Sequence, residues 1–116
     1  MQRDVRAYLW DIRESADSIQ SFIAGVDFKS NTETPLIHSA VERKFEIIGE
    51  ALNLLSKVNP DLARRIPEYA EIIAFRNQLI HGYAGVDHAR VWRIAHASLP
   101  GLRAMAAALL DELGPA

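Results

Sequence analysis

The stretch that decides the fold is PLIHSAVERKFEIIGEALNLLSK, residues 35–57. Its apolar residues recur at steps of three and four, as they do along one face of an α-helix. The main apolar stripe comprises Ile37, Val41, Phe45, Ile48, Leu52 and Leu55, and it is widened by Ala40, Ile47, Ala51, Leu54 and Val58. At about 100° per residue this face covers roughly half of the helix circumference. So broad a face predicts either a helix at the centre of a bundle or an additional subunit contact.

The residues before this helix predict a loop and an earlier helix. Thr34 suits the N-cap position and Pro35 the first turn, while the polar stretch FKSNTETP, residues 28–35, is typical of a loop. A second apolar stripe lies upstream and predicts a helix that Gly25 ends. This stripe comprises Val5, Leu9, Ile12, Ala16, Ile19 and Ile23.

A short connector and a third helix follow residue 57. Pro60 and Pro67 bracket the connector, for which we predict one helical turn at about 61–65. The third helix is predicted over 68–80. The glycines of HGYAGVD, residues 81–87, then break the apolar pattern.

The last helix is predicted to start after Asp87, whose carboxylate suits an N-cap, and to reach about Leu113. Because proline lacks an amide proton and clashes with the preceding turn, Pro100 predicts a kink or a stop near 98–99. No segment alternates with period two over the length of a strand. The sequence therefore predicts a single all-α domain over 1–116, folded as an antiparallel bundle of four to five helices.

Composition excludes several classes of protein. The formal charge of -2 argues against nonspecific coating of nucleic acid, which rests on many Lys and Arg residues. The absence of cysteine excludes disulfides, thiol catalysis and cysteine-ligated zinc. The chain lacks a membrane-spanning apolar run, and its start, MQRDVRAYLWDIRE, does not resemble a secretory signal. We therefore expect a cytoplasmic protein without a membrane partner.

The residues able to do chemistry narrow to RNQLIHGY, residues 76–83. The four histidines do not form a His-x-x-x-His pair, so no metal site is predicted. The histidines other than His81, and both tryptophans, are assigned to surface and packing roles. The chain has no phosphate-cradling glycine loop and no Gly-x-Ser-x-Gly. In RNQLIHGY, four residues separate an arginine from a histidine, one residue separates that histidine from a tyrosine, and an asparagine follows the arginine directly.

This spacing resembles the signature of HepT-like toxins in the HEPN superfamily. The segments RDVRAYLWDI, AVERKFEIIGEAL and GYAGVDHARVWRIAHASLP also resemble that family, so the resemblance spans nearly the whole chain. One departure is IPEYAEIIAFRN, residues 66–77, where the family has a tryptophan after the proline. That difference touches the start of a helix and leaves the motif intact.

The resemblance implies a HEPN-like bundle that cleaves RNA as a homodimer, without a metal ion or another cofactor. It implies that Arg76 holds the phosphate and that His81 acts as general acid or base. These residue types suit the chemistry, because arginine binds phosphate in a bidentate geometry and histidine titrates near neutrality. It further implies a partner, a nucleotidyltransferase-type antitoxin, which would attach AMP to Tyr83 and so silence the nuclease.

Helical geometry adds a constraint on the motif. Five residues turn an uninterrupted helix by about 500°, which leaves Arg76 and His81 roughly 140° apart, whereas Tyr83 lies only about 20° from Arg76. Either the helix ends near His81, with Gly82 relaxing the backbone, or Arg76 of one protomer works beside His81 of another. A helix end there would favour the imidazolium form of His81 and hence the acid role. A symmetric dimer would also supply two histidines for two proton transfers.

Asn77, Glu46 and Arg43 are predicted to support the site. Glu42, Glu46 and Glu50 stack at steps of four, and like charges so placed repel. One interpretation is a solvated face balanced by Arg43 and Lys57. The other is that this acidic ridge lies against Arg76 and orients it, in which case charge reversal of Glu46 would lower activity.

Two alternative functions stay open. One is a noncatalytic subunit that presents substrate or nucleotide to a nucleotidyltransferase, with Arg76 and His81 only gripping phosphate. The other is a purely structural dimerisation bundle, which predicts that neither residue lies in a cleft. Taken singly, Arg76 could form a surface salt bridge, His81 could cap a helix and Tyr83 could pack in a core.

Overall fold

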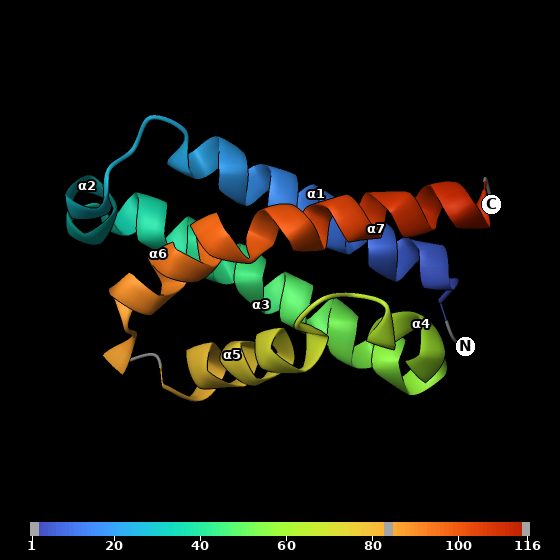
Figure 1. The fold of residues 1–116 in the computed structure, drawn as a ribbon. Helices are drawn as coiled ribbons and strands as arrows, with labels where there is room; N and C mark the ends of the chain where they lie inside the picture. The colour runs from blue at the N-terminus through green and yellow to red at the C-terminus, as the bar shows by residue number, and fades with distance from the viewer. Residues whose placement is uncertain (1–2, 83–84, 115–116) are drawn as a thin grey trace.

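The computed structural model describes residues 3–82 and 85–114, which form seven helices and no strand. The helices are α1 (Val5–Ile23), α2 (Phe28–Glu33), α3 (Pro35–Val58), α4 (Pro60–Arg64), α5 (Tyr69–His81), α6 (His88–Ala97) and α7 (Leu99–Leu113). Figure 1 shows α1, α3 and α7 lying along the length of the molecule, with α5 beside the second half of α3. The prediction of an all-α helical bundle is confirmed.

Helix α3 occupies the centre of the bundle. It packs against α1, α2, α4 and α5, while α7 covers α1 from the other side. Phe45, Ile48, Leu52 and Leu55 of α3 are completely buried. The first explanation of its broad apolar face, a central position, is therefore confirmed, and a subunit contact is not needed to account for it.

Helices α3 and α5 approach each other closely at a glycine. A Cβ atom placed on Gly49 would lie 2.2 Å from Cβ and 2.5 Å from Cγ of Arg76. Those distances are far below van der Waals contact, and neither atom is the movable end of the side chain. The absence of a side chain at residue 49 is therefore what lets α5 lie this near to α3.

The polar stretch at 28–33 was predicted to be a loop, and this prediction is wrong. It forms the short helix α2, capped by Asp27, whose carboxylate accepts a hydrogen bond from the Ser30 amide at 2.7 Å. That bond favours the ionised carboxylate and lowers the pKa of Asp27. Phe28 also packs edge-on against Trp92 of α6, with ring centroids 6.1 Å apart. Capping and this contact compensate for the lack of an apolar stripe.

The predicted helix boundaries after α3 are close to those observed. The predicted turn at 61–65 is α4, and the third helix begins one residue later than predicted, at Tyr69. Glu68 before it has a φ of 59°, a left-handed conformation that costs about 1–2 kcal/mol in a residue with a Cβ. Asp87 caps α6 through a 3.2 Å bond from the Arg90 amide, as predicted.

The break that Pro100 predicts is also present. Helix α6 ends at Ala97, and α7 starts at Leu99 with Pro100 in its first turn. At the other predicted start, Pro35 lies in the first turn of α3, but the Thr34 side chain makes no capping hydrogen bond. None of the helices in the described ranges combines the length and the apolarity that crossing a membrane requires.

We predict that Gly49→Ala lowers the free energy of unfolding by about 1–3 kcal/mol, because the added methyl group forces α3 and α5 apart. The matched control is Gly101→Ala. Gly101 is also helical, but a Cβ atom placed on it would have nothing within 4 Å, so alanine there should raise stability by about 0.5–1 kcal/mol. Urea unfolding of the two variants measures both changes. Equal behaviour of the two variants would contradict the close approach.

Candidate functional site

The motif RNQLIHGY occupies the second half of α5 and the turn after it. The helix ends at His81, where the Gly82 amide still donates to the Gln78 carbonyl at 2.7 Å. The helix thus ends near His81, but residues 76–81 are helical throughout, so this ending does not bring Arg76 and His81 onto one face. Tyr83 lies outside the described residues, so its role as the site of AMP attachment stays a prediction.

Arg76 points towards α3 and is held there. Its Cβ lies over Gly49, and its Nη2 donates to the Glu50 carboxylate in an ion pair. Its Nη1 donates to the Asn77 side-chain oxygen at 2.8 Å, and its buried Nε has no hydrogen-bond partner among the described residues. The side chain keeps 22% of its surface exposed. Arg76 is therefore a positioned guanidinium that still reaches solvent.

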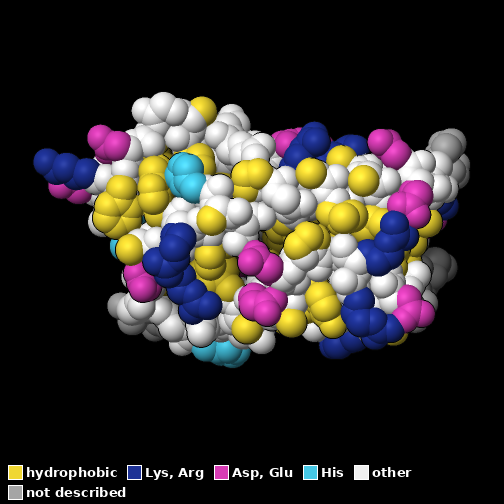
Figure 2. Space-filling view, in the orientation of Figure 1, with side chains coloured by type: hydrophobic (Ala, Val, Ile, Leu, Met, Phe, Trp, Pro, Cys, Tyr) yellow, Lys and Arg dark blue, Asp and Glu magenta, His cyan; other side chains and the backbone are white. Residues whose placement is uncertain are grey.

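A cleft with a volume of about 260 Å³ surrounds the guanidinium of Arg76. The charged side chains that line it are Arg3, Asp11, Arg43, Glu46, Glu50 and Arg76. Charges of both signs thus line the opening. On the face that Figure 2 shows, Lys and Arg side chains are likewise interspersed with Asp and Glu, without one continuous basic patch. Any anion bound here would be held by individual side chains rather than by a broad positive surface.

The glutamates of the acidic ridge of α3 have different partners. Glu50 pairs with Arg76, whereas Glu46 pairs with Arg43, its Oε2 lying 3.2 Å from the arginine Nη1. Glu42 lies 3.1 Å from His38. The ridge therefore does lie against Arg76, but the contact falls to Glu50, one turn beyond the glutamate that we singled out from the sequence.

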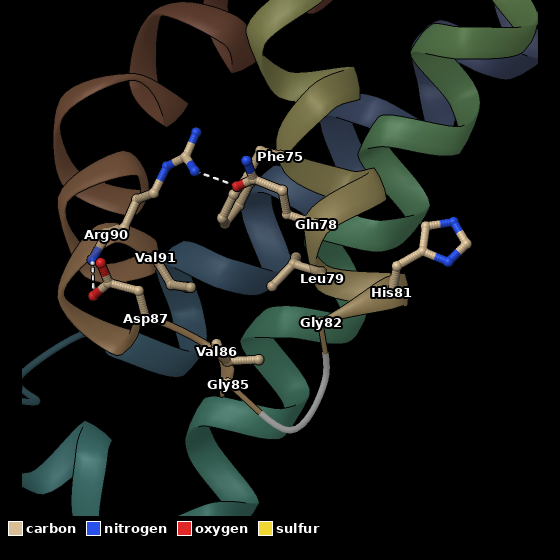
Figure 3. A pocket seen from close by; sticks show the side chains of 10 residues that line it. All are labelled: Phe75, Gln78, Leu79, His81, Gly82, Gly85, Val86, Asp87, Arg90 and Val91. Carbon is tan, nitrogen blue, oxygen red and sulfur yellow. Dashed lines mark hydrogen bonds between the residues drawn. The ribbon is translucent and has the colours of Figure 1, made fainter.

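His81 lines a different cleft, of about 470 Å³, between the end of α5 and the start of α6. Figure 3 shows its imidazole pointing away from Asp87 and Arg90, which lie on the opposite wall. Within the described part of the chain, His81 has no hydrogen-bond or ion-pair partner, and it is exposed. Its ring is thus accessible to a ligand.

Arg90 is a residue of this cleft that the sequence did not single out. Its Nη1 donates to the Gln78 side-chain oxygen, and its guanidinium lies over the Phe75 ring, 5.4 Å from the centroid (Figure 3). Stacking on an aromatic face holds a guanidinium while leaving N–H groups for an anion. Arg90 lies outside the motif, and only the packing of α6 against α5 brings it to the cleft.

Within one chain, the described residues of the predicted site divide unevenly between the two clefts. Arg43, Glu46 and Asn77 lie with Arg76, whereas His81 lies apart from them. Both Arg76 and His81 nevertheless lie in clefts, which contradicts the prediction of the purely structural alternative. Within the described part of one chain, Arg76 and His81 thus belong to separate clefts.

The residues most suited to holding a metal ion lie elsewhere. His38, Glu42 and His88 each offer a ligand atom within 4.8 Å of the others. This group was not predicted from the sequence, because only pairs of histidines on one helix were expected to mark a metal site. The signal available was His38-x-x-x-Glu42, because a spacing of four places an imidazole and a carboxylate on one helical face.

Known proteins with similar sequences are ribonucleases by name. The family described as Ribonuclease HepT-like matches residues 12–109. The protein of Methanocaldococcus jannaschii named Putative RNase MJ1380 is 36% identical over 104 residues, which cover 88% of this chain and 93% of that protein. Probable ribonuclease HepT of Thermococcus cleftensis is 36% identical over 106 residues, covering 89% of this chain and 93% of its own length. No solved structure matches the chain significantly.

A double-mutant cycle should show which glutamate contacts Arg76. We predict that Glu50→Gln and Arg76→Gln are coupled by about 0.5–1 kcal/mol in the free energy of unfolding, because the pair is only partly exposed. The same cycle with Glu46→Gln in place of Glu50→Gln should give a coupling near zero. A larger coupling for Glu46 would contradict the ion pair described above.

Proposed function

This chain belongs to the HepT-like ribonuclease family, and we propose that it is an endoribonuclease that cleaves RNA in a homodimeric site containing Arg76 and His81. The names of its relatives support the ribonuclease activity. The reaction we propose needs no metal ion, because the groups it requires are an acid, a base and a cation on the phosphate.

In the proposed reaction, a ribose 2′-hydroxyl loses its proton and its oxygen attacks the adjacent phosphorus. The bond from phosphorus to the 5′-oxygen of the next nucleotide breaks, and that oxygen takes up a proton. The products are a 2′,3′-cyclic phosphate and a free 5′-hydroxyl. Arg76 neutralises the charge that develops on the phosphoryl oxygens, and His81 transfers a proton.

The observation that carries this proposal is the separation of Arg76 and His81 into two clefts on one chain. A symmetric dimer that brings two copies of α5 together would place Arg76 of one chain beside His81 of the other, in two equivalent sites. In each site His81 would make one of the two proton transfers, with water as its partner in the other. Arg90, on the wall opposite His81, would add a cation for the RNA backbone.

We further propose that the chain is a toxin of a cytoplasmic toxin–antitoxin pair. Its antitoxin would be a nucleotidyltransferase that attaches AMP to Tyr83, two residues after His81. The added phosphates would be negatively charged and bulky, so they would compete with RNA for the cationic site. This part of the proposal rests on the resemblance of RNQLIHGY to the signature of HepT-like toxins.

The nuclease proposal predicts RNA cleavage by pure protein in the presence of a chelator, with 2′,3′-cyclic ends. His81→Ala and Arg76→Ala should each lower the rate about 10²- to 10⁴-fold, the range expected for loss of a proton-transfer or charge-stabilising group. His96→Ala and Arg93→Ala, two exposed residues of α6 outside both clefts, are the matched controls and should retain the rate. If the wild type and His81→Ala behave alike, the nuclease proposal fails.

Mixing the two inactive variants tests the dimeric arrangement. In an equal mixture of His81→Ala and Arg76→Ala, half of the dimers are mixed, and each mixed dimer has one complete site. The mixture should thus regain about a quarter of the wild-type rate after subunit exchange. No recovery, with exchange confirmed by mass spectrometry, would contradict a site shared between chains.

Tyr83→Phe should separate regulation from catalysis. Coexpression of the wild type with a nucleotidyltransferase encoded beside it should add adenylyl groups, visible as a mass increase, and abolish cleavage. The Phe variant lacks the acceptor hydroxyl and should stay unmodified and active. Modification of the Phe variant would show that another residue is the acceptor.

A further inference from the structure

Three side chains from two helices meet outside both clefts of the proposed nuclease. His38 and Glu42 lie one turn apart on α3, and His88 is the first residue of α6. Each is partly buried, with side-chain exposures of 18%, 18% and 28%. None of the three lines the cleft of Arg76 or that of His81. Their proximity therefore needs an explanation other than the proposed reaction.

The two imidazoles point at the same carboxylate oxygen. Nδ1 of His38 lies 3.1 Å from Oε2 of Glu42, and Nδ1 of His88 lies 3.7 Å from that oxygen. The second distance is too long for a hydrogen bond, and within the described ranges the buried Nδ1 of His88 has no hydrogen-bond partner. The rings are also close to each other, with centroids 4.5 Å apart. Protein contacts alone thus leave one buried nitrogen of the cluster unsatisfied.

We propose that His38, Glu42 and His88 bind a first-row divalent cation, with Zn²⁺ as the preferred ion. Two imidazole nitrogens and one carboxylate oxygen are a ligand set that suits such ions. At metal–ligand distances of about 2.0–2.1 Å, tetrahedral ligand atoms lie about 3.3 Å apart. The separations of 3.1 and 3.7 Å bracket that value. Water would complete the coordination.

A bound ion would tie the first half of α3 to the start of α6. The residues that follow His88 include Arg90, and Asp87 directly precedes it, so the tied segment carries one wall of the His81 cleft. The ion would fix that wall without taking part in proton transfer. This role is structural, and it stands independently of the proposed ribonuclease activity.

Zn²⁺ titration of the untagged protein, after removal of metal by a chelator, tests the site. Calorimetry should show about one Zn²⁺ per chain, and Zn²⁺ should raise the melting temperature. His88→Ala and Glu42→Gln should each weaken binding by about 10- to 100-fold or more and remove most of that rise. His96→Ala and Glu46→Gln, a second histidine of α6 and the next glutamate of α3, should bind like the wild type.

Co²⁺ in place of Zn²⁺ gives a second readout. Its visible absorption reports the coordination sphere directly, and the spectrum should change in His38→Ala but not in the two controls. Circular dichroism of every variant in chelator checks that the fold is intact. If the wild type does not bind Zn²⁺ at micromolar concentrations, or if His88→Ala and Glu42→Gln bind it with wild-type affinity, the proposal is wrong. RNA cleavage is not a readout here, so this result and that of the nuclease test are separable.

Discussion

The close contact between Gly49 and Arg76 is the constraint on which the arrangement of the site depends. Because residue 49 has no side chain, α5 lies against the second half of α3, and the stem of Arg76 fills the space that a Cβ would occupy. The guanidinium then reaches Glu50 one residue further along α3. With Arg76 turned towards α3, His81 lies at the end of α5, at the edge of the cleft formed with the start of α6. The helical spacing of the two residues then places them on different sides of α5.

Most of the fold could be predicted from the sequence, because it rests on local signals. Apolar residues at steps of three and four mark α1 and α3, Asp87 marks the start of α6, and Pro100 marks the break before α7. Helix α2 was missed because its stability comes from a cap and from the distant ring of Trp92, not from an apolar stripe of its own. The left-handed Glu68 was not foreseen either, since a glutamate carries no signal for that conformation.

The site could be predicted only in part, because its residues were recognised one by one while their partners come from the packing of helices. The spacing of Arg76 and His81 correctly indicated that they do not share a helical face. It could not indicate that Glu50 rather than Glu46 would meet Arg76, since the two lie one turn apart on the same ridge. Arg90 and the group of His38, Glu42 and His88 depend on where α6 lies, which no local pattern specifies.

The burial of one nitrogen of Arg76 limits how the residue can meet a ligand. Its Nε is covered by the surrounding helices, so the side of the guanidinium formed by Nε and one Nη is closed. Only the outer end, with its two Nη atoms, remains to approach an anion, and both already have a protein acceptor. A phosphate would have to arrive end-on and share these donors with Glu50 and Asn77. The direction of approach, more than the charge of the cleft, would then select which oxyanions can bind.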